Sequence, residues 1–176
     1  MKRSIFLGLT AMLVWMNFSS ALADQKAAFY VNLGFSYYKL GKYQEAAAQF
    51  EKDLALDRNY QNIHALLGSA FFQMDSIDKA ISAYKKQIEL TPKVADYHYN
   101  LGLAYLKKQS YDEAVQAFRM VITLDGNAVK SYRNLGFVLL KQQKLPEAVQ
   151  ALQQAVSLDT TCLLYTSDAA DDAMNV

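Results

Sequence analysis

The sequence predicts an all-α fold in which four helix-turn-helix repeats stack as a solenoid. The first observation behind this prediction is a Leu-Gly pair that recurs at one constant interval, at Leu33-Gly34, Leu67-Gly68, Leu101-Gly102 and Leu135-Gly136. The second is that apolar residues between these pairs fall at spacings of three and four, which is typical of a helix with one buried stripe. The third is a set of short polar turns, such as KLGKYQ and KKQSYD, between the two helices of a repeat.

Two further columns keep the same register along the chain. Alanine stands twelve residues after each of these glycines, and a large apolar residue stands sixteen after it, at Phe50, Tyr84, Phe118 and Leu152. Glycine inside a helix costs about 1 kcal/mol relative to alanine, so its recurrence indicates a place where two helices pack closely. We therefore expect a side chain at Gly68 or Gly102 to hold the first helix of its repeat away from its neighbour.

These columns resemble the tetratricopeptide repeat, a helix-turn-helix unit of about 34 residues. Four copies cover about residues 27–60, 61–94, 95–128 and 129–160. The resemblance implies a right-handed α-solenoid whose first helices line a concave groove. The sequence departs from the family pattern where Tyr or His replaces the usual Trp, and where the terminal proline is present only as Pro92.

Residues 1–23 have the composition of a secretory signal peptide. MKRS is positively charged, residues 5–18 are uncharged and mostly apolar, and SSALA supplies small residues. We predict cleavage after Ala23 and export, to a bacterial periplasm, which leaves a repeat domain of residues 24–160. The apolar run of 14 residues is shorter than the roughly 20 that a membrane-spanning helix needs, so an uncleaved anchor is the weaker alternative.

The repeat pattern stops at SLDT, residues 157–160, and the residues after it fit no period. Residues 162–176 resemble a translated adapter of the kind that is joined to DNA fragments for sequencing. We therefore predict that residues 161–176 are a non-native tail and that Cys162, the single cysteine, is not a native thiol. Because a further repeat should come next, we expect the last helix to expose a face that includes Ala148, Leu152 and Ala155.

Composition and motifs predict a binding protein and not an enzyme. The 18 basic and 17 acidic residues give a net charge of +1, which argues against a nucleic-acid partner. His64 and His98 share one repeat position, but two histidines without a third ligand make a poor metal site, so we expect them to be structural. The acids of Asp112-Glu113 stand at a predicted helix start, where they complement the helix dipole. We predict no catalytic residue, no metal and no cofactor.

The resemblance also implies which side chains face the groove. They are Ala28, Val31, Phe35, Tyr38 and Lys39 in repeat one, Asn62, Ala65, Ser69, Phe72 and Gln73 in repeat two, Asp96, Tyr99, Leu103, Leu106 and Lys107 in repeat three, and Lys130, Arg133, Phe137, Leu140 and Lys141 in repeat four. All except Ala28, Ala65 and Asp96 are predicted to bind a peptide. The surface is apolar and aromatic with a row of lysines at one edge, which suits a partner with acidic residues beside apolar anchors.

Chaperone-binding members of this family hold a terminal carboxylate with a set of Lys, Asn and Arg side chains. The corresponding places here carry Val31, Phe35, Leu66, Asp96 and Asn100, so this mode is not expected in the first three repeats. The alternative for the groove is that its aromatic residues belong to the core. For the whole protein, two alternatives to a protein-binding scaffold stay open: an accessory domain of an envelope enzyme that continues beyond residue 161, and self-assembly through the repeats.

Overall fold

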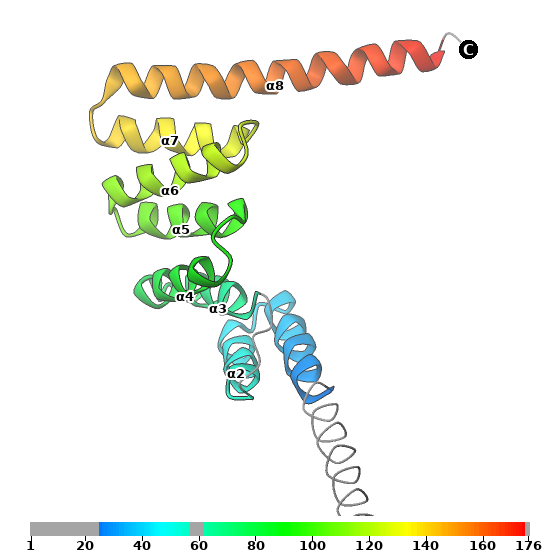
Figure 1. Cartoon of the computed structure of the whole chain (residues 1–176), viewed down its shortest axis with the longest axis vertical. Helices are drawn as coiled ribbons and strands as arrows, with labels where there is room; N and C mark the ends of the chain where they lie inside the picture. Colours follow the sequence, from blue (N-terminus) through cyan, green and yellow to red (C-terminus); the bar gives the residue numbers. More distant parts are fainter. Residues whose placement is uncertain (1–24, 57–61, 175–176) are drawn as a thin grey trace, which may run out of the picture. The chain divides into compact units, whose positions relative to one another are not determined.

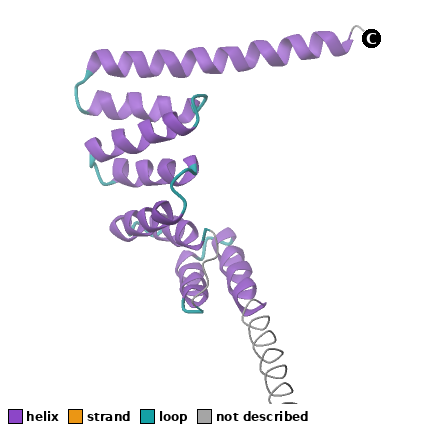
Figure 2. Ribbon diagram, in the orientation of Figure 1, coloured by secondary structure: helices purple, strands orange, loops and turns teal. Residues whose placement is uncertain are grey.

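The computed structural model describes residues 25–56 and 62–174, with side chains as far as residue 159. The predicted signal peptide lies outside the described residues. Every regular element in the described ranges is a helix, and the connections are short turns and loops (Figure 2). The prediction of an all-α fold is confirmed.

The chain divides into two compact units, Met1–Asp75 and Ser76–Val176. The described part of the first unit consists of a helix over residues 25–39 followed by α2 (Tyr43–Leu54) and α3 (Ile63–Gln73). The second unit consists of α4 (Ile77–Leu90), α5 (Ala95–Lys107), α6 (Tyr111–Leu124), α7 (Val129–Lys141) and α8 (Leu145–Met174). The boundary between the units therefore separates the two helices predicted for repeat two.

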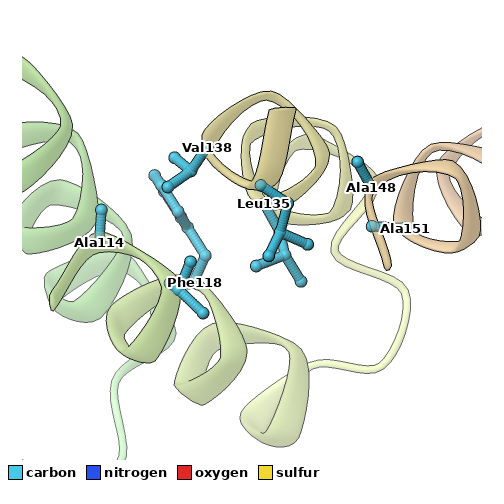
Figure 3. Packing of buried hydrophobic residues seen from close by; sticks show 8 residues of the cluster. Ala114, Phe118, Leu135, Val138, Ala148 and Ala151 are labelled. Carbon is cyan, nitrogen blue, oxygen red and sulfur yellow. The ribbon is translucent and has the colours of Figure 1, made fainter. Parts of the chain in front are cut away.

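Within the second unit, each helix packs against the next one in sequence, from α4 to α8 (Figure 1). The core that joins the last three helices contains Phe118 from α6, Leu135 and Val138 from α7, and Ala148 and Ala151 from α8 (Figure 3). Phe118, Val138 and Ala148 have no exposed surface. Burial of large apolar groups from successive helices is the main stabilising term of such an array.

The turn between the two helices of each repeat places one residue in the left-handed region. This residue is Gly41, Asp75, Gln109 or Gln143, with φ between 58° and 74°, and successive positions are one repeat apart. Glycine adopts this conformation without strain, whereas other residues pay about 1 kcal/mol. Only the turn of repeat one therefore has glycine, the residue that this conformation favours, at the left-handed position.

A polar contact between adjacent repeats recurs at a fixed register in the second unit. Lys108 Nζ donates to Asp78 Oδ1 at 2.6 Å, and Gln142 Nε2, one repeat further on, donates to Asp112 Oδ1 at 2.8 Å. The hydrogen bond with Asp78 and the negative charge of that carboxylate raise the pKa of Lys108. Because both acids lie in the first turn of a second helix, they also complement the dipole of that helix.

The repeated glycines lie where the two helices of a repeat come closest. A Cβ built on Gly102 would stand 2.7 Å from Phe118 Cε1, and one on Gly34 would stand 2.6 Å from Phe50 Cε1. A Cβ on Gly136 would stand 2.6 Å from Leu152 Cγ. Real Cβ atoms do not approach other atoms this closely, so a side chain at Gly102 would require the Phe118 ring or the helix to move. The same expectation for Gly68 stays a prediction.

The prediction of which residues of the last helix are exposed was wrong. Ala148 and Ala155 are buried, with exposed fractions of 0% and 7%, because they pack toward α7. Leu152 is half-buried beneath Gly136. In the part of α8 up to residue 159, the exposed large apolar side chains are Leu145, Val149 and Val156. The helix itself runs through the predicted boundary at residue 160, and the non-native origin of residues 161–176 stays a prediction.

Asp53 of α2 is a buried acid that the sequence analysis did not single out. It has no exposed surface, and neither carboxylate oxygen has a hydrogen-bond partner in the described part of the chain. The equivalent positions of the later repeats hold Gln87, Val121 and Ala155, which are all buried as well. Burial raises the pKa of Asp53, because the ionised carboxyl loses its hydration.

The first prediction concerns the helix contact at Gly102. Replacing Gly102 by Ala gains helix propensity but forces Phe118 to move, so we expect the free energy of unfolding to fall by about 1–3 kcal/mol. Gly126→Ala is the control, because a Cβ at Gly126 would meet nothing within 4 Å. Urea unfolding followed by circular dichroism measures both variants. Equal stability of Gly102→Ala and the wild type would contradict the steric argument.

The second prediction concerns Asp53→Val, which copies the residue found at Val121. Removing a buried carboxylate that has no hydrogen-bond partner among the described residues should raise the free energy of unfolding by about 1–3 kcal/mol at neutral pH. Because the pKa of Asp53 is raised in the folded state, the wild type loses stability as the pH rises above the ordinary carboxyl value of 3.8. The advantage of the variant should therefore grow from acid to neutral pH.

The control for Asp53→Val is Glu51→Gln, an exposed acid of the same helix. This change should alter stability little at either pH. Urea unfolding of the three proteins at an acid and a neutral pH provides the comparison. An advantage of Asp53→Val that does not depend on pH would show that ionisation of Asp53 is not the cause.

Candidate functional site

In the second unit, the predicted groove residues lie on α5 and α7, the first helices of repeats three and four. Two observations bring the N-terminal parts of these helices together. Asn134 Nδ2 of α7 donates to the Tyr99 hydroxyl of α5 at 3.1 Å. Asp96 and Tyr99 of α5 also line the same cavity as Lys130 and Ser131 of α7. This surface of α5 and α7 is called the α5–α7 surface below.

The C-terminal part of α7 is the most exposed apolar part of the α5–α7 surface. Phe137 and Leu140 are 46% and 44% exposed. Lys141 Nζ lies 5.3 Å from the centre of the Phe137 ring, one helical turn away, in a cation–π arrangement. Lys107 and Arg133 are also exposed. Exposed aromatic side chains next to cations make this a candidate binding surface.

The residues predicted on α5 lie deeper. Tyr99, Leu103 and Leu106 are half-buried and pack against the core cluster. The Tyr99 ring meets the buried Phe118 ring edge-on, with the two centres 5.9 Å apart. Tyr99 therefore stabilises the fold as well as lining the α5–α7 surface, and the core alternative applies to it more than to Phe137.

The first unit repeats the exposed pair of α7. Phe35 is 44% exposed, and Lys39 Nζ lies 4.7 Å from the centre of its ring. Phe35 and Lys39 hold the same repeat positions as Phe137 and Lys141. Neighbouring Tyr38 is half-buried and packs edge-on against Tyr43 at 5.2 Å.

The remaining predicted residues of the first unit differ in exposure. Asn62 and Gln73 are exposed, whereas Val31 and Phe72 are half-buried. Ser69 is half-buried, and its hydroxyl donates to the Ala65 carbonyl oxygen at 3.0 Å. Repeat two thus offers no exposed aromatic–lysine pair, because Ser69 and Gln73 stand at those positions.

A cavity of about 390 Å³ lies at the N-terminal ends of α5 and α7. Asp96 and Lys130 come from the first turns of the two helices, and Asp125 and Asn127 come from the loop before α7. Asp125 Oδ1 accepts the Asn127 backbone N–H at 3.0 Å, which stabilises the loop. Sequence reasoning missed Asp125, Asn127 and Ser131. The only sequence signal was the turn-forming Asp-Gly-Asn run.

The residues weighed for metal binding and catalysis have structural partners. His98 is buried, and its Nε2 donates to the Pro92 carbonyl oxygen at 2.7 Å, since a carbonyl only accepts. His64 is half-buried. No group of three His, Cys, Asp or Glu residues that could hold a metal ion occurs among the described residues. None of the helices in the described ranges is both long and apolar enough to cross a membrane.

Comparison with protein families gives a consistent result along the chain. Tetratricopeptide repeat models match residues 27–60, 95–127 and 129–158, and a TPR repeat model matches residues 68–109. The chain belongs to the tetratricopeptide repeat (TPR) family. The shared pattern explains why helices and turns recur along this TPR array, and why close glycine contacts recur at Gly34, Gly102 and Gly136.

Solved structures of TPR proteins share the fold. A crystal structure of MamA superposes with a TM-score of 0.77 at 27% identity, covering 79% of this chain and 81% of MamA. MamA from Desulfovibrio magneticus gives 0.73 at 22% identity, over 77% and 76% of the two chains. YrrB, described as "a TPR protein with an unusual peptide-binding site", gives 0.71 at 19% identity, over 93% and 88%. No curated protein matches the sequence significantly.

The third prediction separates core from surface on α5 and α7. Tyr99→Ala removes a ring that packs on Phe118 and a partner of Asn134, so we expect the free energy of unfolding to fall by about 2–4 kcal/mol. Phe137→Ala should cost less than about 1 kcal/mol, because nearly half of that side chain is already exposed. Thermal melts of both variants test the contrast, and similar losses would mean that Phe137 is also part of the core.

Proposed function

We propose that this TPR protein is an exported, non-catalytic scaffold that binds an extended segment of another protein on the α5–α7 surface. The single observation that carries the proposal is the exposed Phe137 with Lys141 beside its ring, repeated as Phe35 and Lys39 in the first unit. Burial of an exposed phenylalanine against a partner lowers the free energy, because its apolar surface is removed from water. Holding it next to a cation adds a preference for acidic groups nearby.

Charge suggests the chemistry of the partner. The predicted α5–α7 site carries Lys107, Lys130, Arg133 and Lys141, all of them exposed, and the one acid at a predicted groove place on these helices is Asp96. A segment with acidic residues flanking an aromatic or large aliphatic anchor complements this arrangement. In such interfaces the anchor supplies most of the affinity, and the exposed charges mainly set the association rate.

The solved relatives support this proposal through their fold. The peptide-binding site named for YrrB belongs to that protein, and at 19% identity the likeness extends to the helical scaffold. The proposal for this chain therefore rests on its own exposed side chains. Export rests on the charged, apolar and small-residue segments within residues 1–23.

The fourth prediction tests the surface with a display library of short linear peptides. We expect the enriched peptides to combine an aromatic or large aliphatic residue with neighbouring acidic residues. Phe137→Ala should weaken the binding of an enriched peptide by about 2 kcal/mol, as loss of a hot-spot aromatic does. Lys141→Gln should chiefly slow association and reduce its dependence on salt. Calorimetry and stopped-flow fluorescence measure the two effects.

Val149→Ala is the control for Phe137→Ala, because Val149 is an exposed apolar residue of α8 outside the predicted groove. This change should leave peptide affinity unaltered. Thermal melts of each variant establish that the fold is intact. Unchanged affinity of Phe137→Ala, or a loss matched by Val149→Ala, would overturn binding on the α5–α7 surface.

A further inference from the structure

The cavity at the N-terminal ends of α5 and α7 contains polar groups that an apolar anchor would not use. It is lined by Asp96 and Tyr99 of α5, Lys130 and Ser131 of α7, and Asp125 of the loop between α6 and α7. Its volume of about 390 Å³ is at the small end of ligand pockets. It is therefore suited to one long side chain and not to a folded element.

Ser131 gives the cavity wall a hydroxyl group that can bond a polar ligand. The residue is only 1% exposed, yet it is part of the cavity wall. No hydrogen bond joins its hydroxyl to another group in the described part of the chain. A hydroxyl group in a cavity wall takes its hydrogen-bond partner from water or from a ligand. A ligand atom in the cavity would supply one.

The charges around the cavity favour a cation. Asp96 and Asp125 contribute two carboxylates, and Lys130 contributes one ammonium group. Asp96 lies in the first turn of α5 and offsets the positive end of that helix. The first turn of α7 has no acidic residue, so the positive end of this helix is not offset. That helix end and the Lys130 ammonium group would repel a cation in the cavity. One oxygen of the Asp125 carboxylate accepts the Asn127 N–H.

We infer that this cavity binds the guanidinium group of an arginine side chain. The planar group carries five N–H donors, and the cavity offers the Asp96 and Asp125 carboxylates and the Ser131 hydroxyl as acceptors. The Tyr99 ring adds a surface on which a guanidinium stacks. Only the assignment of the arginine to a bound protein segment rests on the proposed function. The cavity and its polar groups do not depend on it.

The test uses three small probes with the full chain. Acetyl-arginine amide carries the guanidinium, acetyl-norleucine amide is an apolar control of similar length, and acetyl-glutamate amide is an anion. Backbone amide resonances of Asp96 and Ser131 are followed by NMR during each titration. We expect the arginine probe alone to shift both resonances in a saturable way. Shifts with all three probes, or with none, would overturn the inference.

Variants that remove one charge from the cavity wall test whether the cavity prefers a cation or an anion. Asp96→Asn should weaken binding of acetyl-arginine amide roughly two- to fivefold, the range for an exposed ion pair. Lys130→Gln should strengthen it by a similar factor, because the variant removes the opposing charge. Glu113→Gln, an exposed acid of α6 outside the cavity, is the matched control and should change nothing. Reversed signs for Asp96→Asn and Lys130→Gln would mean that the cavity binds an anion.

The outcome is separable from that of the peptide experiment. Suppose that acetyl-arginine amide binds saturably but that Phe137→Ala does not change peptide affinity. The inference about the cavity would then hold, and the proposed function would be overturned. If peptide binding requires Phe137 but acetyl-arginine amide does not shift the Ser131 resonance, the proposed function would hold and the inference about the cavity would be overturned. When both hold, the enriched peptides should contain an arginine whose replacement by norleucine weakens binding to the wild type more than binding to Asp96→Asn.

Discussion

The close approach of the two helices of a repeat at Gly34, Gly102 and Gly136 is the constraint on which the rest of the fold depends. At Gly102 the Phe118 ring fills the space that a Cβ would need, and the same ring supports Tyr99. Tyr99 in turn accepts a hydrogen bond from Asn134 of the next first helix. A contact inside one repeat thereby positions a residue of the cavity wall and a bridge to the following repeat.

The turns and inter-repeat contacts keep that packing in register. The left-handed residue recurs at Gly41, Asp75, Gln109 and Gln143, although this conformation is unfavourable for the three that are not glycine. The Lys108–Asp78 and Gln142–Asp112 contacts recur at the same positions one repeat apart. Exposed polar contacts of this kind contribute little free energy, so the turn geometry and the buried core determine the stacking.

The sequence predicted the helices and the glycine contacts because both follow from periodic spacing. The sequence did not predict the burial of Asp53, because acidic residues in helices are usually exposed to solvent and only the packing shows that this one is not. The error at Ala148 and Ala155 has a similar cause: small residues mark a close contact, and here the contact is with α7. Family geometry placed Tyr99 and Phe137 in one groove, but their exposure depends on neighbouring side chains. Ser131 gave no sequence signal because nothing marks a hydroxyl as lining a cavity.

The α5–α7 surface differs chemically between its two ends, and this difference constrains any segment that binds there. Asp96 and the cavity lie at the start of α5, and Lys107 lies at its end, about 16 Å away at 1.5 Å per residue. Phe137 and Lys141 lie in the corresponding C-terminal part of α7. A segment with its arginine in the cavity and its acidic residues near these lysines satisfies both ends in one direction only. In the reverse direction, arginine meets Lys107 and Lys141, and the acids meet Asp96 and Asp125 with Lys130 as the one cation of the cavity wall, so the excess of like charge at both ends would favour the first orientation.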